Sequence, residues 1–400
     1  MPASSADPSA DQRLRTLLGE LAAIERPSAS AGELEAAEWI VSRLAAVGAK
    51  ARLEREPAHG TYWWPLGIGA AAGALANFAA LRGRGLTAAT LGGLAAAAIA
   101  DEFPPGRRRL RKRLRGSRTH NVVCELGPAD AEQTVVIVAH HDAAHSGWIF
   151  HPAIPELVFG RLGVPIEDHD TSPPLMWPLV ASPLLAVLAA ISGSPPIAAR
   201  LGAFLGAGYA ASFAEIGSRA VVPGANDNGT GVILLIALAE RLLAEPTRSL
   251  RVILLSAGAE ESFSEGIKAF GERHFRELDR ESTFFLCVDT VGSPTLSVLR
   301  GEGFLKMYEY PQETLALLDG LAAELGIELI PNLRLRNGTD GLEPLAAGYP
   351  TATLVSVTEL KQPANYHWPT DTAENVDYET VADGVRLCEA AIRRLDERWL

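Results

Sequence analysis

The sequence predicts an α/β fold in which a mostly parallel central sheet is flanked by helices and interrupted by two apolar helical hairpin insertions. Short β-branched runs alternate with helix-length amphipathic segments over most of the chain. Residues 63–100 and 174–216 are, by contrast, almost free of charge and rich in Ala, Gly and Leu. Alternating strands and helices favour parallel pairing, because each crossover helix packs back onto the sheet and covers one of its faces.

The composition fits a folded protein that does not bind nucleic acid. Hydrophobic residues make up 48% of the 400 residues and charged residues 21%, which is enough to build a core. A net charge of -12 disfavours binding to a phosphate backbone. The three cysteines are far apart and predict no disulfide framework. The first residues contain no basic segment followed by an apolar run, so no signal peptide is expected.

Residues 1–60 are expected to contribute N-terminal helices and one strand to the catalytic domain. Two amphipathic helices are predicted between residues 11 and 47, and a short strand at residues 50–54. The second helix has apolar residues at helical spacing, namely Leu34, Ala37, Ile40, Val41 and Leu44.

The two insertions are predicted at residues 61–118 and 173–222. The first is a hairpin of helices at 63–81 and 86–100, followed by a basic stretch, residues 107–118, with eight Lys or Arg among twelve residues. The second hairpin has helices at 174–191 and 197–216. Only the segment 63–81 approaches the roughly 20 apolar residues that a membrane-spanning helix needs.

We expect membrane association through residues 63–100 and 174–216, with the catalytic domain on the cytoplasmic side because the basic stretch follows the first hairpin. The basic stretch would then contact anionic lipid, or else lie free in solvent. The alternative for the hairpins is a hydrophobic lid or a dimerisation surface on a soluble cytoplasmic enzyme.

Residues 119–172 and 223–400 are expected to form the rest of the catalytic domain. Strands are predicted wherever a compact β-branched run occurs, and helices wherever apolar residues recur at helical spacing. The predicted strands are 121–126, 134–139, 250–256, 284–289 and 351–356, and the predicted helices are 232–243, 264–277, 311–325 and 378–395.

The segment VVIVAHHDA ends one strand with His140 and Asp142, two residues apart and therefore on the same face. A carboxylate can orient the second nitrogen of a metal-binding imidazole. Taken on its own, this pair is explained better by a structural histidine. The segment GANDNGTGV places Asp227 in a glycine-flanked turn that opens a helix. Helix capping, which Asn228 can supply, explains that segment alone.

The segment LLSAGAEES is harder to explain structurally, because the adjacent carboxylates of Glu260 and Glu261 follow a buried strand and would repel each other. A cation removes this cost, with one carboxylate as ligand and its neighbour free as a general base. Asp289 ends another apolar strand, where an unpaired acid is expensive, and His367 lies in a polar loop before the last helix. Nitrogen and oxygen donors without thiolate indicate zinc, with manganese or cobalt also compatible.

The order of these segments resembles the zinc-dependent exopeptidase family of the di-zinc bacterial aminopeptidases, which also contains glutamate carboxypeptidase II and glutaminyl cyclases. The resemblance rests on AHHD, GANDNGTG, AEES, VDTVG and YHWPTDTAENVD, which occur in the family's order. It covers the N-terminal helices, most of residues 119–142 and residues 223–400, and leaves out both insertions.

The resemblance implies two zinc ions, each held by one histidine and one acid, with a shared aspartate between them. His140 and Asp289 would bind one ion, Glu261 and His367 the other, and Asp227 both. Three further residues would act in catalysis: Glu260 as general base, Asp142 orienting His140, and Tyr366 stabilising the oxyanion.

The loop GTDGLEPLAAGYPTATL, which contains Asp340, is similar to the family's substrate-side loop. It departs from the family in having Gly341 where a histidine is usual, and no metal ligand is lost by this change.

The activity that the resemblance implies is hydrolysis of the N-terminal peptide bond of a peptide substrate with a free amino terminus. Two alternatives remain at this point. One is a glutaminyl-cyclase-like acyltransferase with a single zinc, and the other is a non-enzymatic member of the family. The complete set of five ligands, with Asp227 in the bridging position, favours the hydrolase. Three other histidines, His145, His151 and His169, are expected to be ordinary loop residues.

Overall fold

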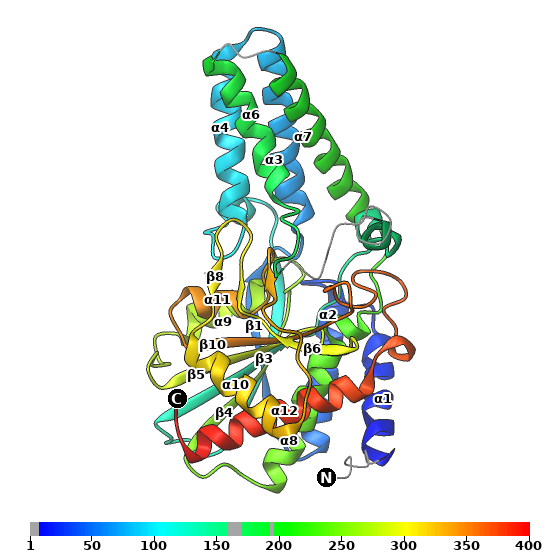
Figure 1. Cartoon of the computed structure of the whole chain (residues 1–400), viewed down its shortest axis with the longest axis vertical. Coiled ribbons are helices and arrows are strands. Elements are labelled where there is room, and N and C mark those ends of the chain that lie inside the picture. Colours follow the sequence, from blue (N-terminus) through cyan, green and yellow to red (C-terminus); the bar gives the residue numbers. More distant parts are fainter. Residues whose placement is uncertain (1–7, 158–169, 193–195) are drawn as a thin grey trace.

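The computed structural model describes residues 8–157, 170–192 and 196–400, and its body is built on a seven-stranded sheet (Figure 1). The strand order is β1-β2-β4-β3-β5-β10-β6. The strands are β1 (Ala51–Ala58), β2 (Ser117–Leu126), β3 (Gln133–His140), β4 (Leu250–Ala257), β5 (Thr283–Val288), β6 (Thr295–Val298) and β10 (Thr351–Val357).

The four central strands β4, β3, β5 and β10 are parallel to one another, which confirms the predicted α/β class. The strands outside them pair antiparallel: β1 with β2, β2 with β4, and β6 with β10. β1 is longer than the predicted strand at residues 50–54, because its eight residues pair along β2 from Ala51 to Ala58. The parallel centre is the part of the sheet that positions the site, since its carboxyl ends lie at one edge.

Successive side chains of the central strands enter two different cores. In β3, Val135 and Ile137 pack into the larger core, whereas Val136 and Val138 pack into the smaller core on the opposite face. This alternation follows from the two-residue period of a strand, and it explains why a strand buried on both faces is continuously apolar.

Helices cover both faces of the sheet, as predicted. The larger core contains apolar residues of α2, α8, α10 and α12, and the smaller core contains those of α9. These helices, with the neighbouring α1 and α11, are α1 (Pro8–Ala22), α2 (Ala31–Ala46), α8 (Thr230–Ala244), α9 (Glu265–His274), α10 (Gln312–Leu325), α11 (Leu342–Ala346) and α12 (Tyr378–Glu397).

Smaller elements lie in the connections between these helices and strands. The strands β7 (Gly301–Glu302), β8 (Tyr308–Glu309) and β9 (Arg334–Leu335) form a second sheet of three strands. One short helix, α5 (Ala153–Pro155), lies in the connection after β3. The remaining short helical segments are η1 (Arg111–Arg113), η2 (Trp148–Phe150), η4 (Ala225–Gly229) and η5 (Ala373–Asn375).

The two insertions form helices, but they do not stand apart as two separate hairpins. Their helices are α3 (Trp63–Leu81), α4 (Gly85–Glu102), α6 (Trp177–Ser192) and α7 (Pro196–Ile216). α3 packs against α7 and α4 packs against α6, so helices of both hairpins contact each other along their length. The result is one four-helix bundle that projects from the body (Figure 1).

The basic stretch, residues 107–118, is not uniformly exposed, so the expectation of a solvent- or lipid-facing run is wrong for two of its arginines. Arg108 is buried against Glu343 at 2.9 Å. Arg111 is buried against Glu102 at 2.9 Å and also donates a hydrogen bond to the Ser262 carbonyl. The first pair connects the basic stretch to α11 of the body and the second connects it to the end of α4, and a buried charge requires such partners.

Candidate metal centre

The predicted ligands converge at the carboxyl edge of the parallel strands. His140 is the last residue of β3, and Glu261 and Asp289 follow β4 and β5. Asp227 comes from the segment before α8, and His367 from the loop between β10 and α12. All five side chains are buried. Residues up to 227 positions apart in the chain, from 140 to 367, therefore meet at one site.

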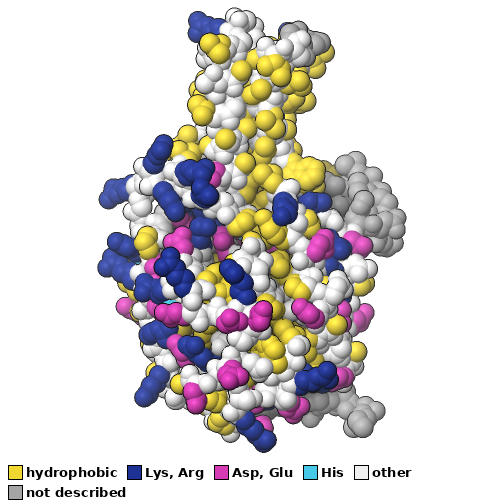
Figure 2. Space-filling view, turned by 90° about the vertical axis from the view of Figure 1, so that its left-hand side faces the viewer, with side chains coloured by type: hydrophobic (Ala, Val, Ile, Leu, Met, Phe, Trp, Pro, Cys, Tyr) yellow, Lys and Arg dark blue, Asp and Glu magenta, His cyan; other side chains and the backbone are white. Residues whose placement is uncertain are grey.

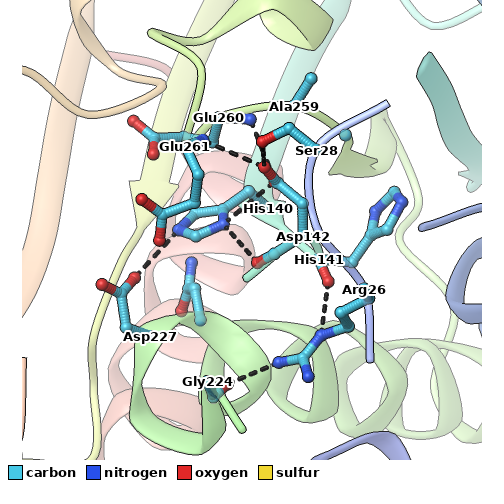
Figure 3. Close-up of polar contacts among 12 residues, drawn as sticks. Arg26, Ser28, His140, His141, Asp142, Gly224, Asp227, Ala259, Glu260 and Glu261 are labelled. Carbon is cyan, nitrogen blue, oxygen red and sulfur yellow. Dashed lines mark hydrogen bonds and ion pairs between the residues drawn. The ribbon is translucent and has the colours of Figure 1, made fainter. Parts of the chain in front are cut away.

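Asp227 lies between the two histidines, with one carboxylate oxygen toward each. Its Oδ1 is 3.2 Å from Nε2 of His140, and its Oδ2 is 3.2 Å from Nε2 of His367. On the first side, Asp289 Oδ1 lies 3.9 Å from His140 Nε2. On the other side, Glu261 Oε2 lies 3.1 Å from His367 Nε2. The donors thus form two groups that share one carboxylate, and part of this arrangement is seen in Figure 3.

The donor set fits a metal ion. Donor atoms of His140, Asp227 and Glu261 all lie within 4.8 Å of one another. Among the described residues, His140 Nε2 and Glu261 Oε1 are buried without a hydrogen-bond partner. Buried polar atoms are normally satisfied, so unpaired atoms that point into a cluster of nitrogen and oxygen donors indicate a bound cation.

Burial and the neighbouring charges shift the pKa values of the acids in the site. Burial raises the pKa of Asp289 and of Glu260 well above their ordinary values. Burial also acts to raise the pKa of Asp227, but the two neighbouring histidine rings hold it well below its usual range. For His367, burial is outweighed by Glu261 and Asp227, which raise its pKa to about 10. Crowded buried carboxylates of this kind are stabilised by a cation.

Asp142 contacts both the first histidine and the loop after β4. Its Oδ1 is 3.4 Å from Nδ1 of His140, as expected for a residue that orients the imidazole, and its backbone carbonyl is 3.2 Å from the same nitrogen. The carboxylate also accepts the backbone N–H groups of Glu260 and Glu261 at 3.0 Å each, and the Ser28 hydroxyl at 2.6 Å (Figure 3). Asp142 therefore fixes β3 and the Glu260–Glu261 loop relative to each other.

Two positioning residues were not predicted from the sequence. Arg26 is fully buried and donates hydrogen bonds to the carbonyls of His141 at 2.7 Å, and of Pro223 and Gly224 at 2.6 Å each (Figure 3). The Asp371 carboxylate accepts hydrogen bonds from the backbone N–H groups of Asn226, at 2.7 Å, and of Asp227, at 3.1 Å. Both hold the backbone that carries Asp227, and their partners are backbone groups that leave no pattern in the sequence.

Replacing Arg26 by Met is expected to destabilise the fold by about 3–5 kcal/mol, because it leaves buried carbonyls unpaired and removes the cation facing nearby acids. Burial lowers the pKa of Arg26 to about 10, against the raising influence of Asp371, Asp142 and Asp227, so the side chain stays charged at neutral pH. The midpoint of thermal unfolding, measured in the same buffer, should fall sharply. The exposed Arg13→Met is the control and should change stability by less than about 0.5 kcal/mol.

The three remaining predicted residues surround the metal ligands. Glu260 is half-buried, and its Oε1 accepts the Ser264 hydroxyl at 3.2 Å. The ring of Tyr366 stacks on His367, with centroids 3.9 Å apart. Asp340 is buried, and neither of its carboxylate oxygens has a hydrogen-bond partner among the described residues. Burial raises the pKa of Asp340 to about 7, as expected for a buried acid without a hydrogen-bond partner.

The glycine at position 341, where the family usually has a histidine, is explained by the lack of space for a side chain. A Cβ at this position would lie 2.3 Å from Thr353 Oγ1 and 2.9 Å from the Tyr310 hydroxyl. No side chain fits there unless these neighbours move.

The other loop histidines contact groups outside the ligand cluster. His145 Nδ1 is 2.7 Å from the Arg219 carbonyl, and the His151 ring lies against Trp148 and Trp368. His169 lies outside the described residues.

The fold is that of the zinc-dependent exopeptidases and related enzymes. The Zn-dependent exopeptidase of Parabacteroides distasonis aligns with a TM-score of 0.55 and 12% identity, over 96% of this chain and 97% of that chain. The aminopeptidase of Aneurinibacillus sp. strain AM-1 gives 0.55 and 14%, over 96% and 93%. The glutaminyl cyclase of Bacteroides thetaiotaomicron gives 0.56 and 11%, over 96% and 97%. A search of curated proteins found no match.

The family comparison gives a more specific result. Residues 212–392 match the model of peptidase family M28, which confirms the predicted resemblance and indicates a peptidase. The matched region contains the Glu260–Glu261 pair and three further proposed ligands, Asp227, Asp289 and His367. His140 and Asp142 precede it, and the structure brings them to the same site.

Proposed function

We propose that this protein is a metallo-aminopeptidase with two zinc ions. His140 and Asp289 would hold one ion, Glu261 and His367 the other, and Asp227 would bridge them. The observation that carries this proposal is the position of Asp227, whose two oxygens lie 3.2 Å from the two different histidines. Sharing one carboxylate between two ions is the arrangement of two-metal hydrolytic sites. The match to peptidase family M28 supports a peptide as substrate.

Glu260 is proposed as the general base. It lies next to the ligand Glu261, its backbone N–H is held by the Asp142 carboxylate, and its own carboxylate accepts the Ser264 hydroxyl at 3.2 Å. Bound zinc supplies Lewis acidity that polarises a peptide carbonyl and acidifies a water molecule. Glu260 would accept the proton of that water and deliver it to the leaving amine. Tyr366, held by stacking on His367, would donate its hydroxyl to the developing oxyanion.

Metal stoichiometry of the purified protein, measured together with hydrolysis of a panel of aminoacyl anilides, tests the proposal. Two zinc ions per chain with turnover are expected. A chelator should abolish hydrolysis, and added zinc should restore it, because the ion would supply the Lewis acidity that the reaction needs.

The same measurement separates the alternatives. One ion and no hydrolysis would favour a glutaminyl-cyclase-like acyltransferase, a fold neighbour of this chain. A chain without metal would favour a non-enzymatic role.

We also propose that the chain associates with a membrane through residues 63–100 and 174–216, with the catalytic body on the cytoplasmic side. Two helices of the described chain, Trp63–Leu81 and Pro196–Ile216, are long and apolar enough to cross a bilayer. Apolar helices of this length also occur in the cores of soluble proteins, but only 44% and 28% of the respective apolar windows are buried here. The greater part of each window therefore faces outward.

A further inference from the structure

The bundle of α3, α4, α6 and α7 has small side chains inside and large apolar side chains outside. Its interior positions include Ala70, Ala74 and Gly73 of α3 and Gly202 and Gly206 of α7. A water-soluble bundle has the opposite distribution, because burial of large apolar side chains is what drives its helices together. Helices in lipid instead use small residues at their contacts, since the lipid is as apolar as the protein interior.

The helices approach too closely for side chains at the contacting glycines. A Cβ at Gly206 would lie 2.6 Å from Ser182 Oγ, and one at Gly202 would lie 2.4 Å from Asn77 Oδ1. The buried Asn77 side chain donates to the Ser182 carbonyl at 2.8 Å, which links α3 to α6. Glycines spaced four apart and inward-facing polar groups are both typical of packed membrane helices.

The outer surface of the bundle is apolar over most of its length. Leu75 and Leu94 are 61% and 66% exposed, and Ile191 and Phe204 are each 74% exposed. In Figure 2 the projecting part of the visible face shows hydrophobic side chains mixed with white atoms, and basic side chains appear at its tip and below it on the body. A patch of this extent is rarely left in water by a soluble protein.

The two ends of the bundle carry arginine and tryptophan residues of the kind found at the two surfaces of a bilayer. At the tip, Arg82 and Arg84 lie in the loop between α3 and α4, and Arg200 lies in the first turns of α7. At the base, Trp64 and Trp177 are 61% and 45% exposed at the starts of α3 and α6, where membrane proteins place interfacial tryptophans. The 19 residues of α3 rise about 28 Å, close to the roughly 30 Å of hydrocarbon in a bilayer.

Exposed basic residues also gather where the bundle joins the body. We call this group the basic collar; it consists of the exposed members of the basic stretch, Arg107, Arg109, Lys112, Arg113, Arg115 and Arg118. Arg109 pairs with Asp101 at 3.4 Å. The buried Arg108 pairs with Glu343 of the body and the buried Arg111 with Glu102 at the end of α4, so the segment that carries the collar is fixed at the junction of bundle and body.

We propose that the four helices span a lipid bilayer as one unit, with the arginine tip on the far side and the basic collar against anionic headgroups. This deepens the membrane association proposed above and does not depend on the peptidase activity. The base of the bundle also packs against the loop that carries Glu261, because Tyr62 stacks on Phe263, two residues further along the chain, with ring centroids 5.1 Å apart. The bundle would therefore hold the metal centre next to the membrane surface.

Limited trypsin digestion of the full chain tests this without any variant. The protein is inserted into preformed vesicles of equal parts phosphatidylcholine and phosphatidylglycerol, which leaves the large body outside. Exposed loops are preferred cleavage sites, and the loop with Arg82 and Arg84 is exposed. Cleavage in this loop is expected only after detergent opens the vesicles. Cleavage after Arg398, exposed at the C-terminal end of the body, should occur equally in both conditions.

Two outcomes would overturn the proposal, and they distinguish a bundle that lies on the membrane surface from a chain that does not bind the membrane. In the first, trypsin cleaves after Arg82 and Arg84 in sealed vesicles although the chain resists extraction with alkaline carbonate. This would show that the bundle lies on the membrane surface. Chain that is extracted by carbonate, or is a dimer without detergent, would show that the apolar surface binds no membrane. If the chain is a dimer without detergent, the triple variant Leu75→Lys, Leu94→Lys and Phe204→Lys would be a soluble monomer.

The same triple lysine variant is a second arm of the test. These side chains face outward from the bundle, so the lysines should be tolerated in water and should abolish carbonate-resistant binding. The control places three lysines on the body, at Leu53, Leu243 and Leu400, which are 38%, 37% and 40% exposed. The control should remain fully membrane-bound, and equal loss in both variants would contradict the proposal.

Discussion

Glu260→Gln is expected to retain both metal ions and to lower kcat about 10²- to 10⁴-fold, the range that a positioned general base contributes. The amide keeps the size of the side chain and can still contact the Ser264 hydroxyl, which Glu260 accepts at 3.2 Å. It cannot accept a proton from water at neutral pH. Steady-state hydrolysis of an aminoacyl anilide, together with zinc content by atomic absorption, measures both quantities on one sample.

Glu272→Gln is the matched control, because Glu272 is an exposed glutamate of α9 beyond the site. It should leave kcat and zinc content unchanged. Unaltered turnover in a zinc-replete Glu260→Gln protein would remove Glu260 from the role of base. Loss of zinc together with turnover would instead mean that Glu260 helps to hold the metal.

Asp227→Ala is expected to reduce the zinc content from two ions to at most one per chain, because it removes the one carboxylate that faces both histidines. Activity should fall by more than about 10²-fold, since the loss of a direct ligand exceeds the 10- to 100-fold effect of outer-shell partners. Competition with a coloured chelator measures the number of ions and their affinity.

Asp130→Ala, at an exposed position in the loop between β2 and β3, is the control and should bind two ions. Two ions retained in Asp227→Ala with normal affinity would refute the bridging role of Asp227. Thermal unfolding of both variants separates a lost ligand from a lost fold, because removing one acid from a crowded cluster should not itself unfold the chain.

The buried strands were predictable because their signal is local. β-branched residues from Val135 to Val138 are buried whichever neighbour the strand takes, so their pattern predicts a strand with both faces covered. The strand β6, Thr295–Val298, was not predicted, because four residues give too short a pattern to separate a strand from a loop. The order of the strands rests on pairings between distant segments, which no local pattern contains.

The candidate ligands were predictable from the chemistry of single residues. Acids and histidines that follow apolar strands are costly unless they bind something, and each can be recognised without knowing its partner. Arg26 and Asp371 could not be found in this way, because their partners are backbone groups of residues 141, 223–224 and 226–227. Any sequence supplies such groups, and only the fold decides which of them come within reach.

The α/β class, the apolar character of the two insertions and the types of donor available to a metal ion follow from the residues alone, since these depend on composition and spacing along the chain. The position of Asp227 between two histidines, and the packing of helices from two separate hairpins into one bundle, become visible only in the folded chain. Both depend on contacts between remote segments. A distance between two side chains is set by how the whole chain packs, and no local pattern of residues records it.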